Sequence, residues 1–506
     1  MGFGPVTRPT SVGSWRLTPA HAKNTQGLLA SPFGHLPEAC ALFVQLSRGG
    51  TGAWIAAIRA ACPITDATGQ ATPSAAMAFT WSGLEAMGLD DATLATFSPA
   101  FQEGMHQIDR QRRLSDIAES GTVLEGGPRW GGNPARSLTG AVESLSTPIT
   151  VHAVLLLYAE DTATLAAQVV MAEAALKTGG ATVSHRLALS LRYDATKRAR
   201  EHFGFADGIS QPVPQGEAIV SDSGSPLPLD PLHGIAAGDV LLGHCNAQGE
   251  PAPGPMVSVA LCHMEELTKQ GAPEGFRNLG LDGSYLVLRE LRQDVAAFWM
   301  SMHNEMASSN PIDAIWLANR VVGRTMDGDP LIPGGTLPPL GDDPRNDFTY
   351  FATDPHGLGC PVGAHVRRAN PRDGLAPNAD SAPDLLAAAQ NHRILRRGRK
   401  FGPTIVDPLV DDGAERGLLF MCLNTDLVRQ FEFVQQTWML NTNFGTLLNE
   451  TDPLLGPAGR FTVPAERMRL RPTVQTFVRF AGGEYFFLPS LPALDFLQTL
   501  PAEVVT

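Results

Sequence analysis

The chain has 506 residues, of which 43% are hydrophobic, and this is enough apolar material for two or three domains with cores of their own. Lysine and arginine total 38 against 51 acidic residues, so the formal net charge is −13 at pH 7. This balance argues against non-specific binding to nucleic acids and against docking on an anionic membrane. The charge balance instead favours a protein that acts on small molecules.

The cysteines and the N-terminal residues bear on the cellular compartment. Six cysteines are scattered along the chain with no CxxC pair and no spacing typical of zinc ligands, so we expect reduced thiols. Residues 1–28 contain neither an apolar signal-peptide core nor a twin arginine. No stretch reaches the roughly 18 apolar residues needed to cross a membrane. We therefore expect a cytoplasmic protein without a membrane partner.

Strand and helix patterns alternate in the N-terminal half. A short apolar run predicts a strand at residues 39–46, followed by a helix at 53–61 and a second strand at 75–80. A buried strand is expected at 151–158, and Asp161 or Thr162 caps the helix that follows. That helix should bury Leu165, Val169, Ala172 and Leu176 and end at Gly179-Gly180.

The same alternation returns in the C-terminal half, where we expect strands at residues 284–291 and 417–422 and helices at 294–306 and 426–438. Between the halves, residues 212–280 are rich in Pro, Gly, Asp and Ser. This composition predicts a long irregular connection rather than a third core. The chain is therefore expected to contain two similar modules that combine helices with strands.

Standard reaction motifs are missing from the sequence. It contains no Walker loop, no GxGxxG after a strand, no HExxH and no GxSxG. These absences argue against kinases, nicotinamide dehydrogenases, zinc proteases and α/β-hydrolases. Candidate chemistry is left to three short segments of unusual composition.

The first segment is GFADGISQPV, residues 204–213, which places Asp207 between Gly204 and Gly208. The glycines allow turns and the close approach of a large flat ligand. Phe205 and Ile209 would keep water scarce around the carboxylate and so tune its affinity for protons. The alternative is an Asx-turn at the end of a strand.

The second and third segments are basic. In GCPVGAHVRRANPR, residues 359–372, His365 stands among arginines that suit a ligand with carboxylates. The alternative is a structural histidine in a loop with solvated arginines. In RILRRGRKFG, residues 393–402, arginines stand beside apolar residues, with a basic surface strip as the alternative.

Asp207, His365 and Arg396 together supply the parts that haem-dependent peroxide activation requires. One imidazole nitrogen must bind the iron and leave the opposite position open. A base must carry a proton from the inner oxygen of the peroxide to the outer one. A fixed cation must stabilise the negative charge that develops as the O–O bond breaks.

The same segments resemble the signature motifs of the dye-decolorizing (DyP-type) peroxidases. GFADGISQP is similar to the GxxDG motif of this family, CPVGAHVRRANPR to its proximal-histidine motif, and RILRRGRKFG to its distal-arginine motif. The likeness extends over roughly residues 201–489, and more loosely to FTWSGLEAMGL at residues 79–89.

The resemblance implies an α+β fold of two ferredoxin-like modules, with antiparallel sheets and packed helices, of the dimeric α+β barrel superfamily. The expected divisions are an N-terminal extension at residues 1–30 and an N-terminal module at 31–215 that contributes the distal segment. A connector or insertion at 216–280 and a haem-binding module at 281–506 would complete the chain.

By motif position, the resemblance also implies haem b. His365 would be the proximal ligand of the iron, Asp207 the distal acid–base residue and Arg396 the distal cation. Arg396 is preferred to Arg397 because it stands five residues before Phe401-Gly402, which matches the spacing in the family.

Further residues would support this haem. The propionates would be bound by Arg367 and Arg372, with Arg368 as a further candidate. Gly204 and Gly208 would let the backbone run close to the porphyrin. Glu450 or Asp452 would accept a hydrogen bond from the proximal imidazole, and the sequence leaves this choice open.

The resulting prediction is a peroxidase that reduces hydrogen peroxide and oxidises an unidentified electron donor, such as a phenol or a dye, one electron at a time. The alternative is a haem-binding carrier or haem-processing protein that uses the same pocket without turnover. A homo-oligomer is compatible with the sequence. Aromatic residues that could relay oxidation to the surface, although each is more typical of ordinary core, are Trp299, Trp316, Trp438 and Tyr350.

Overall fold

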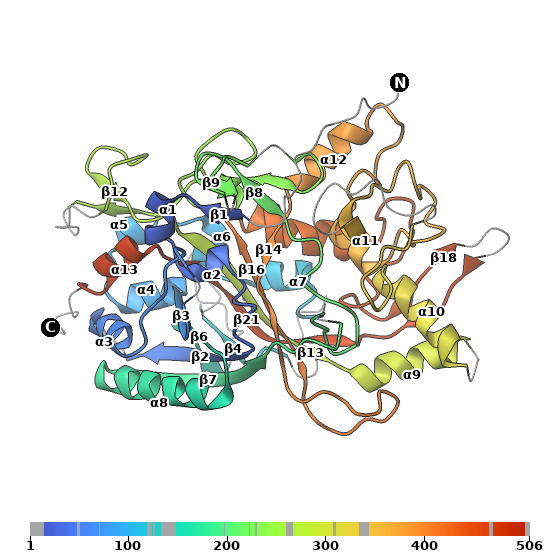
Figure 1. Ribbon diagram of the computed structural model, residues 1–506, viewed down its shortest axis with the longest axis horizontal. Coiled ribbons are helices and arrows are strands. Elements are labelled where there is room, and N and C mark those ends of the chain that lie inside the picture. The colour runs from blue at the N-terminus through green and yellow to red at the C-terminus, as the bar shows by residue number, and fades with distance from the viewer. Residues whose placement is uncertain are drawn as a thin grey trace.

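A computed structural model of the chain describes residues 15–47, 51–69, 71–118, 124, 127–132, 148–196, 198–221, 223–227, 230–259, 267–306, 310–332, 344–464 and 469–500. Within these ranges, a large antiparallel sheet runs through the middle of the molecule, with helices around it (Figure 1). The path of its strands determines where the functional site lies.

The N-terminal half of the sheet is built from two strand-helix-strand units. Its elements are β2 (Glu38–Leu46), α3 (Ala53–Ala61), β3 (Ser74–Phe79), β6 (Ala153–Ala159), α8 (Thr162–Thr178) and β7 (Ala181–Ser190). The strands lie in the order β3-β6-β2-β7. Asp161 caps α8, since its carboxylate accepts a hydrogen bond from the Thr164 amide at 2.8 Å. The strands and helices predicted here agree with the observed ones to within two residues.

The C-terminal half repeats this arrangement. Its elements are β13 (Ser284–Gln293), α9 (Val295–Met306), β14 (Leu395–Arg396), β15 (Arg399–Phe401), β16 (Gly417–Asn424), the π-helical segments η3 (Val428–Glu432) and η4 (Val434–Met439), and β21 (Val478–Leu488). The order is β21-β13-β16, with β14 and β15 both paired to the other edge of β16. The predicted strands at 284–291 and 417–422 are confirmed, and the predicted helix at 426–438 is π-helical over most of its length.

The two halves join into a closed ring of strands. β13 pairs with β21 along one edge and with β16 along the other. β21 meets β3 at Phe487 and Phe79, and β15 meets β7 at Lys400 and Ser190. The predicted α+β fold of two ferredoxin-like modules in a barrel is therefore confirmed.

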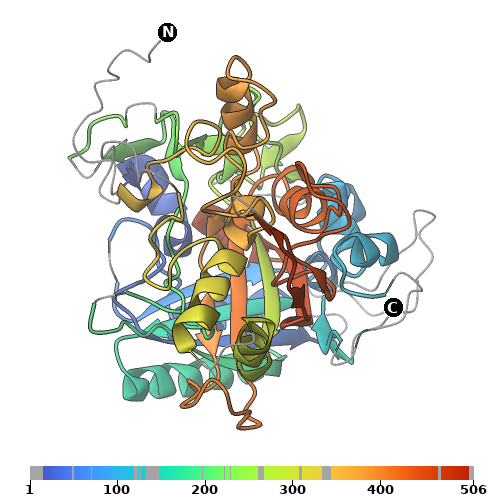
Figure 2. The same cartoon turned by 90° about the vertical axis from the view of Figure 1, so that its right-hand side faces the viewer.

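The remaining helices surround this ring. They are α1 (Pro19–Asn24), α2 (Gly27–Ala30), α4 (Trp81–Ala86), α5 (Asp91–Leu94), α6 (Pro99–Glu103), α7 (Ile108–Arg113), α10 (Pro311–Val322), α11 (His365–Ala369), α12 (Ala382–Gln390) and α13 (Leu491–Leu497), with short 3-10 turns η1 (Ala237–Asp239) and η2 (Pro344–Asn346). Figure 2 shows the yellow, orange and red elements of the C-terminal half gathered on the side that faces the viewer. Among the residues that the structure describes, no helix is long and apolar enough to cross a membrane.

Short strand pairs occupy much of the predicted connector and the edges of the molecule. These strands are β1 (Trp15–Leu17), β4 (Trp130–Gly131), β5 (Ile149–Thr150), β8 (Val213–Gln215), β9 (Ile219–Ser221), β10 (Gly234–Ala236), β11 (Met256–Ser258), β12 (Phe276–Asn278), β17 (Gly459–Arg460), β18 (Val463–Pro464), β19 (Arg469–Leu470) and β20 (Thr473–Val474). They form two-stranded sheets apart from the ring. The divisions predicted at residues 30, 215 and 280 remain predictions.

Side chains alternate between the two faces of each strand, and this alternation separates the core from the site. Leu288 of β13 and Leu419 and Met421 of β16 belong to an apolar cluster that takes side chains from every strand of the ring, and it therefore fills the interior. Their neighbours Arg289 and Phe420 point to the other face and line a cavity. The outer face of the C-terminal strands is thus one wall of that cavity.

A buried ion pair fixes the π-helical wall on the opposite side. The Glu432 carboxylate of η3 accepts hydrogen bonds from Arg110 Nε at 2.6 Å and from the Tyr485 hydroxyl at 2.9 Å. All three side chains are buried. Arg110 belongs to α7, so the pair ties the N-terminal half to the helix behind the cavity.

The Glu432→Ala variant should lower the free energy of unfolding by roughly 3 kcal/mol, because it removes the buried carboxylate of Arg110 and the acceptor of the Tyr485 hydroxyl, leaving Arg110 only the more exposed Glu103. Asp109→Ala is a matched control that removes the exposed partner of Arg112 and should cost about 1 kcal/mol at most. Urea unfolding of both variants measures the difference. Equal stability of the two would show that the buried pair does not hold the helix.

Candidate active site

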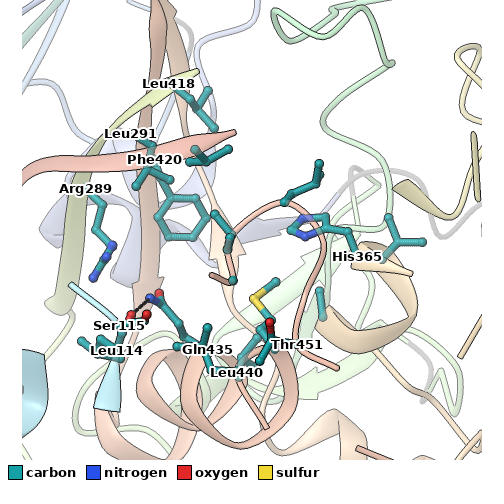
Figure 3. A pocket seen from close by; sticks show the side chains of 18 of the residues that line it. Leu114, Ser115, Arg289, Leu291, His365, Leu418, Phe420, Gln435, Leu440 and Thr451 are labelled. Atoms are coloured by element: carbon teal, nitrogen blue, oxygen red, sulfur yellow. Dashed lines mark hydrogen bonds between the residues drawn. The ribbon is translucent and has the colours of Figure 1, made fainter. Parts of the chain in front are cut away.

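A large cavity lies between the outer face of the C-terminal strands and the segments that cover it. Its volume is about 1080 Å³, at the upper end of the usual range for small-molecule sites. Figure 3 shows Phe420 and Leu418 on the strand side and Gln435, Leu440 and Thr451 on the opposite side. His365 points into the space between them. The cavity therefore has room for a large flat ligand between apolar walls.

His365 opens the short helix α11 and is oriented by a buried carboxylate. Its Nδ1 lies 3.0 and 3.2 Å from the two carboxylate oxygens of Asp452. The Asp452 carboxylate also accepts the amides of Leu454 and Leu455, both at 2.9 Å. Because Nδ1 is engaged in this way, Nε2 is the nitrogen that can serve a ligand in the cavity.

The pKa values of this pair show how strongly the two groups interact. Burial alone would lower the pKa of His365, but the Asp452 carboxylate outweighs it and raises the pKa above its ordinary value. Burial would raise the pKa of Asp452, but the charge and hydrogen bond of His365 outweigh it and lower that pKa. Glu450, the other carboxylate considered from the sequence, turns to the amide of Thr462 at 2.8 Å and to its hydroxyl.

Asp207 and Arg396 line the same cavity as His365. Arg396 Nη1 lies 3.3 Å from Asp207 Oδ1, and each side chain is 34% exposed. Arg396 also donates to the Ile209 carbonyl at 2.8 Å, and the Asp207 carboxylate accepts the Gly208 amide at 2.6 Å. This placement favours a role in a site over the alternatives of a simple Asx-turn and a basic surface strip.

Arg397, the neighbour that was not preferred from sequence, instead donates to the carbonyls of residues 28 and 29, away from the cavity.

Gly204 and Gly208 have positive φ angles of 97° and 79°, which explains the need for glycine in this loop. The residues of the loop that line the cavity are its neighbours, such as Phe205 and Ile209. The two glycines therefore shape the loop, and the predicted contact of their backbone with a cofactor stays a prediction.

The arginines of the proximal segment go to different places. Arg367 stacks over the Tyr350 ring at 4.2 Å and donates to the Cys360 carbonyl at 2.8 Å, and it is not among the residues that line the cavity. Arg368 donates to main-chain carbonyls at the end of η4, including that of Trp438 at 2.8 Å. Arg372 alone of the three lines the cavity.

Arg372 belongs to a group of arginines that sequence reasoning did not assemble. Arg324 and Arg393 line the cavity with it. Burial is the main cause that lowers the pKa of Arg372 to about 10 and of Arg393 to about 9, and neighbouring guanidiniums add to the effect. Buried like charges are costly unless an anion accompanies them. The group therefore suits a ligand that brings carboxylates.

Glu201 is a second residue that sequence reasoning missed. It lines the cavity six positions before Asp207, and its carboxylate accepts the amides of Phe203 and Phe205 at 2.8 and 2.9 Å. Gln293 donates to it at 2.7 Å. Burial raises the pKa of Glu201 to about 7, against these hydrogen bonds, and the nearby charge of Asp207 adds to the rise. An acidic residue three positions before the 204–213 segment was the available signal.

The aromatic residues considered as relays are mostly core. Trp299, Trp438 and Tyr350 are buried, and Trp316 is half-buried beneath the Arg320 guanidinium. Cys360 is also buried, and burial raises the pKa of its thiol to about 11, which fits a packing role. Of these residues, Tyr350 alone lines the cavity.

The donor set fits the haem that the sequence resemblance implies. An imidazole held by a carboxylate is the usual ligand arrangement for a metal ion in proteins. The apolar walls suit a porphyrin, and Arg372 and Arg393 suit its propionates. Asp207 and Arg396 line the same space and offer a base and a cation.

Comparisons with known proteins give an independent line of evidence. No protein-family model matches the chain. The dye-decolorizing peroxidase msp1 of Mycetinis scorodonius is 29% identical over 454 residues, which cover 83% of this chain and 75% of the relative. The dye-decolorizing peroxidase of Exidia glandulosa is 30% identical over 386 residues, which cover 72% of this chain and 68% of the relative.

Solved structures agree on the fold. The crystal structure of a DyP-type peroxidase from Anabaena sp. superposes with a TM-score of 0.67 at 22% identity and covers 95% of each chain. The resemblance stated from the three sequence segments is confirmed by these relatives. This chain therefore belongs to the dye-decolorizing peroxidase family and is a peroxidase.

Proposed function

We propose that this peroxidase binds haem b in the described cavity, with His365 as the ligand of the iron and Asp452 as the carboxylate that orients it. The observation that carries the proposal is that His365, which Asp452 orients from behind, lines the same cavity as the Asp207–Arg396 pair. When bound, haem supplies the redox chemistry that cleaves the O–O bond. The roles of the side chains follow from what each can donate or accept.

Asp207 is the proposed acid–base residue. Its carboxylate accepts the proton of one peroxide oxygen and donates it to the other as that oxygen leaves as water. Arg396 lies beside it with a permanent positive charge and stabilises the negative charge that develops during cleavage. Glu201 holds the loop that carries Asp207, through the amides of Phe203 and Phe205.

Arg372 and Arg393 are the proposed partners of the haem propionates, with Arg324 beside them. The main support is that these guanidiniums line one cavity, where burial lowers the pKa of Arg372 and of Arg393 and a neighbouring guanidinium adds to the effect, so that anions would relieve their repulsion. Arg367 is a weaker candidate than it was from sequence, because it does not line the cavity and its guanidinium is engaged by the Cys360 carbonyl and Asp354.

Hydrogen peroxide and an electron-rich reductant such as a phenol or a dye are the proposed substrates. A haem carrier without turnover is the alternative, and it would use His365 equally well. A carrier has no use for a carboxylate and a guanidinium paired on the cavity wall, so the Asp207–Arg396 pair favours the enzyme.

Asp207→Asn and Arg396→Leu should each slow the reaction with peroxide by about 100-fold or more, because one removes the base and the other the cation. Stopped-flow recording of the change in the Soret band after one equivalent of peroxide measures the rate in haem-loaded protein. Asp495→Asn and Arg59→Leu, which break a partly exposed ion pair of 2.6 Å between residues that do not line the cavity, are the matched controls. A double variant of Asp207 and Arg396 that reacts as fast as the parent would leave the carrier alternative standing.

Arg393→Leu should speed the loss of haem by roughly 10-fold to 100-fold, since a charge-assisted hydrogen bond contributes about 1.5–3 kcal/mol. Transfer of haem to excess apomyoglobin measures the rate. Arg192→Leu, at an exposed arginine paired with Glu38, should leave the rate unchanged. Unchanged retention in Arg393→Leu would remove Arg393 from the propionate site.

Glu201 should give the protein a distinct pH dependence of stability. Its pKa rises from 4.5 to about 7 on folding, so its contribution is fully present below about pH 4.5 and is lost as the pH rises to about 7. In Glu201→Gln, the stability difference from the parent should therefore shift in favour of the variant by about 2 kcal/mol between pH 5 and pH 8. Only the pH dependence of this difference, that is its slope against pH, is diagnostic, because the substitution also changes the hydrogen bonds of residue 201 and so shifts the free energy of unfolding at every pH.

Urea unfolding at several pH values measures that slope. Glu217→Gln, at an exposed glutamate, is the matched control and should keep the parent's slope. A Glu201→Gln slope identical to the parent's would mean that the Glu201 carboxyl ionises alike in the folded and unfolded chain.

A further inference from the structure

Two histidines and an aspartate from distant parts of the sequence meet outside the cavity. His21 lies on α1, His244 in the loop after η1, and Asp282 in the turn before β13. His21 Nδ1 and His244 Nε2 lie 2.8 and 2.7 Å from the same carboxylate oxygen of Asp282. The three ligand-type atoms all lie within 4.8 Å of one another. None of the three residues lines the cavity described above.

The carboxylate at the centre of this cluster is fixed in place. The Asp282 side chain is 1% exposed, and its second oxygen accepts a hydrogen bond from Asn24 Nδ2 at 3.1 Å. Asp282 has a φ of 60°, a left-handed conformation that costs a non-glycine residue energy unless its surroundings hold it. The backbone and Asn24 thus direct one carboxylate oxygen at the two imidazoles.

The imidazoles leave one side of the cluster open. His244 is 13% exposed and His21 is 30% exposed. Their rings meet edge to face with centroids 4.7 Å apart, so both can direct a nitrogen to one point without stacking. Through the exposed part of His21 the cluster borders on solvent.

We propose that His21, His244 and Asp282 form a binding site for one divalent transition-metal ion, with Zn²⁺ as the best match. Two imidazoles and one carboxylate are a common protein donor set for zinc, with water in the fourth position of a tetrahedron. Bonds of about 2.0–2.1 Å in a tetrahedron put ligand atoms about 3.3 Å apart, so the two nitrogens must withdraw from Asp282 by about half an ångström. Small rotations of the two histidine side chains supply this movement.

The protonation of the two histidines allows a metal ion to replace their hydrogen bonds to Asp282. Without a metal, the two ring nitrogens donate N–H groups to Asp282, whereas a bound ion needs their lone pairs. In neutral imidazoles each proton moves to the other ring nitrogen, so no proton has to leave the protein. Asn24 keeps its hydrogen bond to the second carboxylate oxygen and supports the site as an outer partner. The ion would then tie α1 to the 244 loop and to the start of β13.

Isothermal titration of ZnCl₂ into the haem-loaded, tag-free full chain tests the proposal after chelator treatment. One zinc ion per chain should bind, and His21→Ala and His244→Ala should each weaken binding far more than tenfold. Asn24→Ala should weaken it by roughly 10-fold to 100-fold, as outer partners of metal ligands usually do. His356→Ala, at an exposed histidine, and Cys245→Ser, at the exposed thiol next to His244, are controls that should bind zinc like the parent.

An anomalous difference peak at the zinc edge between the three side chains is the second expected result, and zinc should raise the melting temperature of the parent but not of His21→Ala. No zinc uptake, or equal uptake in both histidine variants, would mean that the cluster is only a hydrogen-bonded tie. Asp207→Asn protein should still bind zinc, so failure of the proposed peroxide chemistry and failure of the metal site are distinguishable.

Discussion

Pairing of β13 along both of its edges is the constraint on which the rest of the structure depends. It closes the strands into a ring, so every strand has one face inside the ring and one outside. Apolar side chains from all strands fill the inside, and the outside must be covered by helices and loops. Over the C-terminal strands this cover stands away from the sheet and leaves the cavity. Residues of one strand face and of the covering segments therefore make the site together.

Much of the fold follows from local patterns in the sequence, because the strands and helices of both halves have clear apolar periods. The closed ring does not follow from local patterns. Its closure pairs Phe79 with Phe487 and Lys400 with Ser190, and no local pattern encodes contacts between such distant residues. The π-helical form of residues 428–439 was also out of reach. In a π-helix each hydrogen bond joins residues five apart instead of four, and this change hardly alters the side-chain pattern of so short a segment.

The residues of the site likewise fall into two groups, those that their own sequence segment identifies and those whose place depends on distant contacts. His365, Asp207 and Arg396 stand in segments whose composition is unusual by itself, so sequence alone could nominate them. Arg367 and Arg393 stand in the same segments, and only packing directs Arg367 to the Cys360 carbonyl and Arg393 to the cavity. The choice of Asp452 over Glu450 likewise depends on Thr462, twelve residues further on, which engages Glu450.

The two ion pairs of the cavity differ in how firmly they are held. Asp452 is buried and accepts two backbone amides besides His365, so separating that pair would leave a buried charge uncompensated. The Asp207–Arg396 contact is 3.3 Å long between side chains that are each about one third exposed, and such pairs contribute only about 0–1 kcal/mol. A ligand can therefore replace one partner of the second pair at small cost, while the orientation of the His365 ring stays fixed. This asymmetry, with one rigidly held imidazole and one exchangeable ion pair, suits the roles proposed for them, in which a proton moves beside a fixed centre.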